Sequence, residues 1–446
     1  MPRHLKDWQN QNMPAVEVIE LQSPAGAAKV TPVASLLSNS LAMGIANVLG
    51  RGLAYAGFIL MARRVDARYV GAYALLVTAG MIVDLVSNLG LDKILIREIS
   101  ARPAAEGQSY FWAALPIRFV TATGSSTIAW GLLLFFFKRE LAVTPLETGV
   151  FLSAVLAAGV SRNCEAYLTA HERLLPVAIA QLSERIVFFC AVLLLLFDVL
   201  SFGKMLCFAP LAALVRLLAV AWSTSKIWTR RLVRKRQHLR PLLRNAVELF
   251  SVEILALVYF RSDVFLVARM GGLRETAYYQ VSYKVFDGCL SFFSGLLVAS
   301  FPRIVRDKSR STLNNTLALG TALIAAPVAG VILARQQILG ALRPEYVAGA
   351  TSLVWLMLTL PLVYITSTLA NAAIAAGRVR LLILMAGLLL IVNVSLNLIL
   401  IPRYSINGAA FSTFACELFS ATMLCPFVMR ALPRAAAPAK LEVHGL

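Results

Sequence analysis

The sequence predicts an all-α integral membrane protein with about twelve transmembrane helices in two halves of six. The first observation is composition: the 446-residue chain is 59 % hydrophobic and 15 % charged, whereas soluble domains carry about a quarter of their residues as charge. The second is that apolar stretches of about twenty residues, each able to cross about 30 Å of hydrocarbon as a helix, recur from Ala34 to Met429. The third is a sequence pattern of twelve residues in the first half of the chain that returns 206 residues later in the second half.

The apolar stretches give the elements in order. Residues 1–34 are polar, contain several prolines and lack the apolar core of a signal peptide, so they predict a flexible cytoplasmic tail. A basic linker at 229–245 separates an amino-terminal bundle, 35–228, from a carboxyl-terminal bundle, 246–430, and 431–446 form a second cytoplasmic tail. The expected spans lie near 36–60, 69–92, 113–137, 149–170, 175–199, 205–228, 246–269, 277–301, 316–336, 348–374, 379–401 and 408–430.

The formal net charge of +19 would favour nucleic-acid binding in a soluble protein, but here it follows the expected topology. The densest basic run, TRRLVRKRQHLRPLLR at 229–244, joins the sixth and seventh spans and is typical of an anchor on anionic headgroups. Cytoplasmic loops of membrane proteins are enriched in Lys and Arg. We therefore expect both termini in the cytoplasm, membrane lipids as contacts and no nucleic-acid partner.

A pattern returns after 206 residues: ARRVDARYVGAY at 62–73 matches ARMGGLRETAYY at 268–279. The matched pairs are Ala62 and Ala268, Arg63 and Arg269, Arg68 and Arg274, and Tyr73 and Tyr279. Two halves of six spans follow, and because six is even, both halves enter the membrane in the same direction. Parallel repeats of this kind are characteristic of transporters in which two bundles rock about a cavity near the middle of the bilayer.

Ionisable residues inside the spans point to a polar interior, because a charge facing lipid costs about 2.5 to 3.5 kcal/mol. Arg51 has no acidic residue within its own span and is flanked by glycines, and Arg118 and Arg216 also lack an acidic neighbour nearby in the sequence. Guanidinium groups suit bidentate binding of phosphate oxygens, so these three arginines are candidate ligands of an anion. Arg261 of the motif YFRSDVF is the next candidate.

The alternative is that the arginines form ion pairs across the bundle with acids such as Asp84 or Glu253. Arg162 and Glu165 are also three residues apart on one helical face, and Glu184 and Arg185 are expected to find partners on neighbouring helices.

Four acidic residues are candidates for coupling transport to a proton or sodium gradient. The sequence does not select among Asp84, Glu253, Asp263 and Asp287. The six cysteines lie in apolar spans without paired spacing, and the four histidines lie far apart in loops or tails, so we expect no metal site and no cofactor.

The chain resembles the oligosaccharide flippases of the multidrug/oligosaccharidyl-lipid/polysaccharide exporter superfamily from about Ser35 to Arg430. The resemblance rests on five stretches in this order: ARRVDARYVGAYALL after the first span, SNLGLDKILIREIS at 87–100, YFRSDVFLVARMGGLRETAYYQVSYKVFD at 259–287, LRPEYVAGATSLVWLM at 342–357 and NVSLNLILIPRYSINGAAFSTFACE at 393–417.

The resemblance implies two six-helix bundles forming a V around a central cavity. It also implies alternating-access transport of a polyprenyl-diphosphate-linked oligosaccharide to the outer leaflet, for O-antigen, capsule or exopolysaccharide synthesis. The bacterial inner membrane would be its location, and a polysaccharide polymerase and glycosyltransferases would be its partners. Cavity cations of such flippases are thought to engage the diphosphate, which agrees with the interpretation of Arg51.

Two other functions are weighed against this one. A multidrug exporter of the same superfamily would favour acidic and aromatic residues for cationic drugs, and the arginines inside the spans argue against it. A membrane polymerase, ligase or glycosyltransferase would need catalytic acids, histidines or metal ligands on sizeable aqueous loops. The loops expected here are short, so we expect a transporter and not an enzyme. No Walker motif is present, which argues against an ATP-driven pump.

Overall fold

The computed structural model describes residues 33–138, 140–228, 239–307 and 309–432, and every regular element in these ranges is helical. The first half holds α2 (Val33–Arg64), α3 (Ala67–Asn88), α4 (Leu91–Ser100), α5 (Ala104–Phe137), α6 (Pro145–Ala170), α7 (Leu174–Leu196), α8 (Phe202–Leu206) and α9 (Phe208–Ser225). The second half holds α10 (Leu239–Met270), α11 (Gly272–Asp307), α12 (Arg310–Leu333), α13 (Arg335–Gly340), the 3₁₀ helix η2 (Pro344–Gly349), α14 (Ala350–Ala375) and α15 (Val379–Ala431).

The starts of several helices follow from their sequences. Thr144 and Glu147 form a capping box at α6 with Pro145 in the first turn, where the missing amide hydrogen of proline is not needed. The Ser309 hydroxyl accepts a hydrogen bond from the backbone of Thr312 and caps α12. These short polar signals fix where each apolar run begins as a helix.

The α3 to α4 segment differs from the prediction of one span ending near 92 followed by a loop. Leu89 (φ 48°) and Gly90 (φ 72°) both adopt the left-handed conformation that ends α3. A second helix then begins at Leu91, and its buried residues Leu91, Ile94, Leu95 and Ile99 follow helical spacing. The break matters for the site because it places Asp92 at the start of α4.

The 53-residue helix α15 is a hairpin of two spans. At 1.5 Å per residue a straight helix of this length would extend about 80 Å, more than twice the hydrocarbon thickness. The backbone of Ser405 (φ 49°, ψ −133°) breaks the helix, and α10 then contacts both segments, since Ser262 lies 3.3 Å from Asn393 and Tyr259 lies 3.0 Å from Glu417. The expected spans 379–401 and 408–430 are these two segments.

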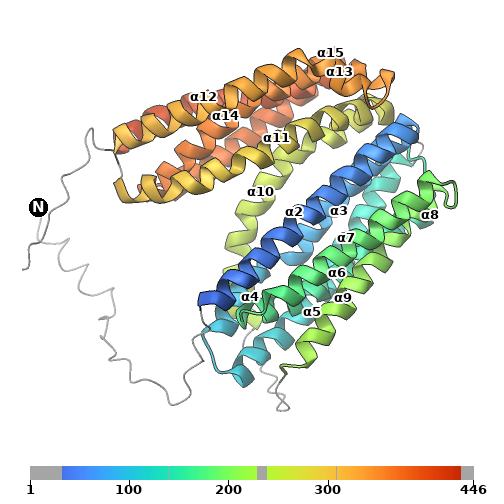
Figure 1. The fold of residues 1–446 in the computed structure, drawn as a ribbon, viewed down its shortest axis with the longest axis vertical. Helices are drawn as coiled ribbons and strands as arrows, with labels where there is room; N and C mark the ends of the chain where they lie inside the picture. Colours follow the sequence, from blue (N-terminus) through green and yellow to red (C-terminus); the bar gives the residue numbers. More distant parts are fainter. Residues whose placement is uncertain (1–32, 139, 229–238, 308, 433–446) are drawn as a thin grey trace, which may run out of the picture.

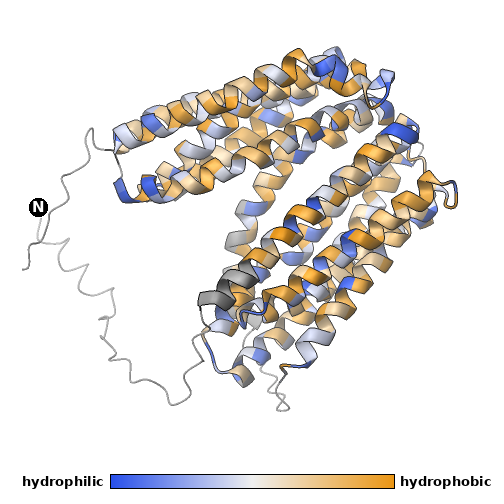
Figure 2. Ribbon diagram, viewed as in Figure 1, coloured by the Kyte–Doolittle hydropathy of each residue, from blue (hydrophilic) through white to orange (hydrophobic). Residues whose placement is uncertain are grey.

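Nine helices of the described residues are long and apolar enough to cross a membrane by length and composition alone. Those nine count α15 once, and they leave out α6 and α10, both of which carry several charged residues along their length. With the two segments of α15 counted separately and α6 and α10 included, the described ranges contain twelve long helical segments. Figure 2 shows hydrophobic residues along most of each helix, and large apolar side chains such as Phe135, Phe292 and Ile391 are exposed.

The helices form two arms that meet at one end and diverge at the other, so the molecule is V-shaped (Figure 1). One arm contains α2 to α9 and the other α11 to α15, while α10 runs between them. The first half of α10 packs on the first arm through Leu242 and Ala246, and its second half contacts α15. The predicted all-α membrane fold is confirmed.

The two copies of the repeated pattern meet where the arms join. Residues 62–73 contain the turn from α2 to α3, and 268–279 contain the turn from α10 to α11, the equivalent place in each half. A Cβ atom at Gly71 would collide with the carbonyl group of Leu273, so the beginnings of α3 and α11 touch through their backbones. Of the domain borders expected from the sequence, 1–32, 229–238 and 433–446 lie outside the described residues, and α10 begins at Leu239.

The closed end of the V is held by apolar and polar contacts between the arms. One core cluster contains Phe58 and Val70 of the first arm and Ala277 and Tyr346 of the second. Three polar contacts surround it: Arg274 with Asp66 at 3.5 Å, Arg269 with Glu140 at 3.5 Å, and the Arg343 guanidinium donating to the Val65 carbonyl at 2.8 Å.

Candidate substrate cavity

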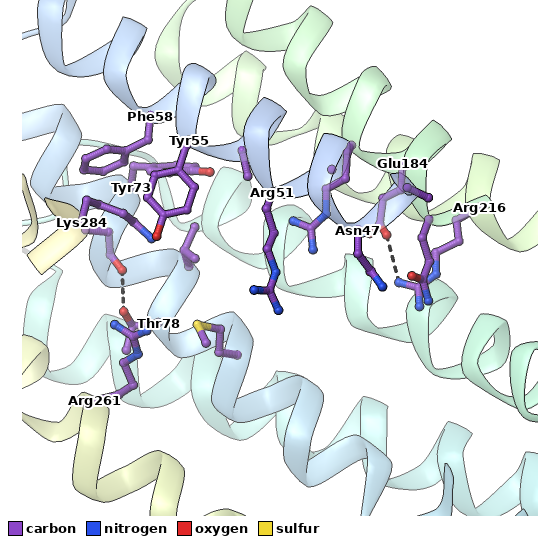
Figure 3. Close-up of a pocket in the computed structure, with 18 of the residues that line it drawn as sticks. Asn47, Arg51, Tyr55, Phe58, Tyr73, Thr78, Glu184, Arg216, Arg261 and Lys284 are labelled. Atoms are coloured by element: carbon purple, nitrogen blue, oxygen red, sulfur yellow. Dashed lines mark hydrogen bonds and ion pairs between the residues drawn. The ribbon is translucent and has the colours of Figure 1, made fainter. Parts of the chain in front are cut away.

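A cavity of about 610 Å³ lies between the arms. Helices α2, α3, α4, α6, α7 and α9 form most of its wall, and α10 and α11 contribute Arg261, Gln280 and Lys284. Its charged lining residues are six cations and three acids: Arg51, Arg162, Arg185, Arg216, Arg261, Lys284, Asp92, Glu165 and Glu184. Figure 3 shows side chains from several of these helices converging on the same space.

Arg216 of α9 lines the cavity as expected, but it is held by two carboxylates. Its Nε lies 2.6 Å from Glu165 and its Nη1 lies 2.9 Å from Glu184, the pair drawn with a dashed line in Figure 3. Gln181 donates a further hydrogen bond to Glu165 at 3.0 Å. Breaking a buried charge pair by removing one partner is costly, so this arrangement fixes Arg216 in place.

Arg162 of α6 is also paired. It contacts Asp84 of α3, and its Nη1 lies 3.1 Å from Asp92 of α4. Arg162 and Glu165, expected from their spacing to pair with one another, instead each bind partners on other helices. The one-turn spacing places both on the same face of α6. There Arg162 belongs to one group of ion pairs and Glu165 to another.

Arg118, expected to contact the diphosphate, lies outside the cavity lining. Its side chain is 0 % exposed, and its guanidinium donates to Asn163 at 2.7 Å, Asn88 at 3.2 Å and Asp92 at 2.5 Å. Every side of the cation therefore faces an oxygen acceptor from α3, α4 or α6. The geometry is that of a structural ion pair, because no part of the group reaches the cavity.

Arg261 of α10 lines the cavity next to Lys284 of α11, and both approach one carboxylate. Asp287 lies 3.5 Å from Arg261 and 3.8 Å from Lys284. The Arg261 guanidinium also lies over the Tyr283 ring, 5.0 Å from its centre, a favourable cation–π contact. The second arm thus contributes two cations that share one acid.

Arg51 and Arg185 differ from the other cavity cations. None of the ion pairs found among the described residues includes either of them, whereas Arg162, Arg216, Arg261 and Lys284 each have a carboxylate partner. Both side chains are exposed to the cavity. In Figure 3 Arg51 extends from α2 into the space between the groups around Lys284 and Arg216.

Sequence reasoning did not select Arg185, because the adjacent Glu184 suggested that both were structural charges. Consecutive residues of a helix point about 100° apart, and here Glu184 turns to Arg216 and leaves Arg185 facing the cavity. One sequence signal could have found Arg185. It is an arginine in an apolar span whose adjacent acid, Glu184, pairs with a different cation, Arg216 of α9.

A second cavity of about 550 Å³ lies between α3 and the helices α10 and α11. It shares Met81, Arg162 and Arg261 with the first cavity, so the two border each other. Three of the four candidate coupling acids line it. Asp84 pairs with Arg162, Asp287 with Arg261, and Glu253 with Lys93 at 2.8 Å.

The fourth acid, Asp263, lies outside the linings of both cavities. It is only 3 % exposed, it accepts a hydrogen bond from the Tyr279 hydroxyl, and it accepts another from the Val264 amide at 2.8 Å. Glu417, also buried, accepts from Tyr259 at 3.0 Å and Thr366 at 2.8 Å. These two acids of the second half are satisfied mainly by hydroxyl groups.

The chemistry of the first cavity suits an anion with sugars attached. Its lining carries a formal excess of three positive charges, and its amide and hydroxyl groups include Asn47, Gln181, Gln280, Tyr55 and Thr78. Within the described ranges, no group of three or more His, Cys, Asp or Glu is placed to hold a metal ion.

Comparison with known proteins adds a family and a fold. A family model described as polysaccharide biosynthesis protein matches residues 36–307. A lipid II flippase, MurJ, in an inward closed conformation superposes with a TM-score of 0.72 at 13 % identity, over 86 % of this chain and 87 % of that one. An inward-facing multidrug resistance MATE family transporter of the MOP superfamily superposes with a TM-score of 0.70 at 11 % identity, over 85 % of this chain and 94 % of that one.

A third similar structure is a MOP superfamily transporter from Pyrococcus furiosus, with a TM-score of 0.60 at 11 % identity over 89 % of this chain and 96 % of that one. Its title states that a reverse polarity of its binding pocket suggests a different function. None of the curated proteins matched the chain. At these identities the solved structures establish the fold of MOP superfamily transporters.

Proposed function

This chain belongs to the family of polysaccharide biosynthesis proteins, and on that premise we propose that it is a flippase for a polyprenyl-diphosphate-linked oligosaccharide. The expectation of a membrane protein related to polysaccharide flippases is thereby confirmed, as is the expectation of a transporter and not an enzyme. The proposal adds the substrate and its direction, from the cytoplasmic to the outer leaflet.

The observation that carries the proposal is the cationic cavity between the arms. A lipid-linked diphosphate is strongly anionic, and its headgroup must cross a region where an unpaired charge costs several kcal/mol. Arg51 and Arg185 supply positive charge without a carboxylate partner in that region, and the amide and hydroxyl groups beside them suit sugar hydroxyls. The polyprenyl chain would stay in the lipid between the arms.

The proposed cycle follows from the V shape. We propose that the units 35–228 and 246–430 rock about their closed end, as in transporters built from parallel repeats. The first residues of α2 and the last residues of α15 both lie at the diverging side of the V (Figure 1). We place both termini and the basic run 229–244 in the cytoplasm of a bacterial inner membrane by the positive-inside rule, and in this proposed orientation the diverging side of the V faces the cytoplasm.

The energy source is part of the proposal. Moving two phosphate charges outward is favoured by an inside-negative membrane potential, at about 2.3 kcal/mol per charge per 100 mV. The candidates for ion coupling stay Asp84, Glu253, Asp263 and Asp287. Three of them, Asp84, Glu253 and Asp287, line the second cavity, which borders the cationic one.

The rival transporter is a multidrug exporter, since a solved structure with this fold carries that name. Cationic drugs would meet unfavourable charge at Arg51 and Arg185, so the cavity supports an anionic substrate. A membrane polymerase or ligase finds no support in the family match; we propose such enzymes and glycosyltransferases only as partners that supply and consume the lipid-linked glycan.

Depletion of the protein in its own cells tests the function. We expect lipid-linked repeat units to accumulate in the inner leaflet and surface polysaccharide to disappear, with both restored by the full chain. Arg51→Ala should insert into the membrane at normal levels but fail to restore transport. Unchanged surface polysaccharide together with increased sensitivity to cationic dyes would instead establish the exporter.

A further inference from the structure

We infer that the closed end of the cavity between the arms holds the acetamido group of an N-acetylated sugar, and that Gln280 is the hydrogen-bond donor that recognises it. The inference rests on the proposed function, because that function supplies a sugar joined to the lipid carrier. It adds the chemical class of that sugar and a residue that determines the specificity.

Gln280 of α11 lines this cavity and has an unsatisfied amide group. The residue is only 4 % exposed, and its amide nitrogen has no hydrogen-bond partner within the part of the chain that the structure describes. Buried amides are nearly always hydrogen-bonded, because they give up water when they are buried. Gln181, another glutamine of the lining, is satisfied by Glu165 at 3.0 Å. Gln280 instead leaves a donor that a molecule in the cavity can use.

Three aromatic residues form an apolar wall at the same end of the cavity. Tyr55 and Phe58 lie about one turn apart on α2, and Tyr73 lies on α3. Figure 3 shows them together on one side of Arg51, with the groups around Arg216 on the other side. Phe58 also belongs to the core cluster that joins the arms, so this wall lies toward the closed end of the V.

Gln280 faces this wall from the second arm. It lies four residues, about one helical turn, before Lys284, so both side chains are on the same face of α11. The Lys284 ammonium lies 5.4 Å from the centre of the Tyr55 ring and 5.7 Å from that of the Phe58 ring. The closed end therefore has a hydrogen-bond donor on one side and aromatic rings on the other.

An acetamido group matches both sides of this corner. Its carbonyl oxygen can accept the hydrogen bond from the Gln280 amide, and its methyl group can pack against the aromatic rings. A hydroxyl group at the same sugar carbon has no methyl group for the rings. A sugar carboxylate would bring a negative charge to the negative faces of the rings, and Lys284 already faces Asp287 at 3.8 Å.

The spacing along α2 indicates which sugar reaches the corner. Tyr55 and Phe58 follow Arg51 by four and seven residues, which is about 6 Å and about 10 Å along the helix. Under the proposed function, a sugar ring joined directly to a diphosphate beside Arg51 lies within reach of the aromatic wall. The acetamido group therefore belongs to this first sugar of the repeat unit.

The test measures binding of three probes to the purified full chain in detergent: farnesyl-diphospho-N-acetylglucosamine, farnesyl-diphosphoglucose and farnesyl-diphosphoglucuronic acid. The three share the lipid and the diphosphate and differ only in the substituents of the sugar. We expect the wild type to bind the N-acetylglucosamine probe about tenfold more tightly than the glucose probe, from one hydrogen bond and one buried methyl group. The glucuronic acid probe should bind no more tightly than the glucose probe.

Gln280→Met removes the amide and keeps a side chain of similar length. The hydrogen bond is lost and the apolar wall stays, so the preference for N-acetylglucosamine should fall to about threefold, through weaker binding of that probe alone. The unfolding temperature should not fall, since the amide nitrogen has no partner to lose among the described residues. Gln336→Met, the same change at an exposed position of α13 outside the cavity lining, should bind all three probes as the wild type does.

The outcomes distinguish the sugar subsite from the function it rests on. A wild type that binds the glucose probe as tightly as the N-acetylglucosamine probe, or a Gln280→Met variant with an unchanged preference, would overturn the subsite and leave the flippase proposal standing. Tightest binding of the glucuronic acid probe would overturn the acetamido group as the feature that is recognised. A wild type that binds none of the three probes would overturn the flippase proposal as well.

Discussion

At the residue scale, Arg118 and Arg51 show that the same side chain inside an apolar span has two different roles. Arg118 is surrounded by Asp92, Asn88 and Asn163 and is shielded from the cavity. Arg51 is exposed to the cavity, and no ion pair among the described residues includes it. Burial and partners therefore assign the first to stability and the second to the proposed substrate.

This assignment predicts opposite effects of one substitution. Arg118→Met leaves buried amide oxygens unpaired and takes one of two cations from Asp92, so we expect it to lower the free energy of unfolding by about 3 kcal/mol. Arg51→Met should leave stability unchanged and abolish transport. Thermal unfolding in detergent and a transport assay on both variants check this, and a stable Arg118→Met protein would contradict the structural role.

The roles of individual arginines could not be predicted from the sequence. Sequence reasoning selected Arg51, Arg118 and Arg216 because each is a cation in an apolar span without an acid nearby in the chain, and it added Arg261 as part of the motif YFRSDVF. Their partners are distant in sequence: Asp92 is 26 residues from Arg118, and Glu165 is 51 from Arg216. Such pairs depend on how helices pack, which periodicity does not reveal, so structural and exposed arginines could not be separated.

At the element scale, the turn within α15 predicts a backbone effect. Ser405 has a positive φ of 49°, a conformation that glycine adopts freely and a β-branched residue strongly resists. We expect Ser405→Val to lower the free energy of unfolding by about 1–3 kcal/mol relative to Ser405→Gly. Both variants lose the hydrogen bond to Glu275, so the comparison isolates the backbone; equal stability would show that the turn is not strained.

The contact between the turns of the two repeats predicts a second effect. Gly71→Ala places a methyl group against the Leu273 carbonyl, and such overpacking costs about 1–3 kcal/mol. Because the contact joins the arms, we expect the closed end to open more often. Ala277→Cys, at a buried position of the core cluster between the arms and in a background without the native cysteines, should then react faster with a membrane-impermeant thiol reagent.

Gly44→Ala is the matched control for this experiment, because no atom lies within 4 Å of a Cβ built there. It should leave the reaction rate at position 277 unchanged. Equal rates in Gly71→Ala and Gly44→Ala would mean that the closed end does not depend on the Gly71 contact.

Most elements could be predicted because about twenty apolar residues in a row leave few structures other than a spanning helix. The hairpin of α15 was predicted as two spans for the same reason. The helix α4 was missed: its apolar residues Leu91, Ile94, Leu95 and Ile99 alternate with charges, so the segment has an amphipathic pattern and not a spanning one.

At the scale of the whole molecule, alternating access requires the closed end of the V to separate. Asp66 and Arg274, whose side chains lie 3.5 Å apart across the arms, are suitable positions for a reversible link. We expect the double variant Asp66→Cys and Arg274→Cys, joined by a short bifunctional methanethiosulfonate reagent, to stop transport, and a reducing agent to restore it. Each single variant, treated alike, should stay active, and transport through the linked protein would rule out this rocking motion.

The central claim is that this chain alone moves a lipid-linked diphosphate oligosaccharide across a bilayer through its cationic cavity. The most direct measurement reconstitutes the purified chain in liposomes and follows the transfer of a labelled polyprenyl-diphosphate oligosaccharide between leaflets. The account predicts rapid transfer with the wild type and, with Arg51→Ala at equal incorporation, transfer no faster than in protein-free liposomes. Equal transfer rates for the wild type and Arg51→Ala, or no transfer by the wild type under an imposed membrane potential or ion gradient, would contradict it.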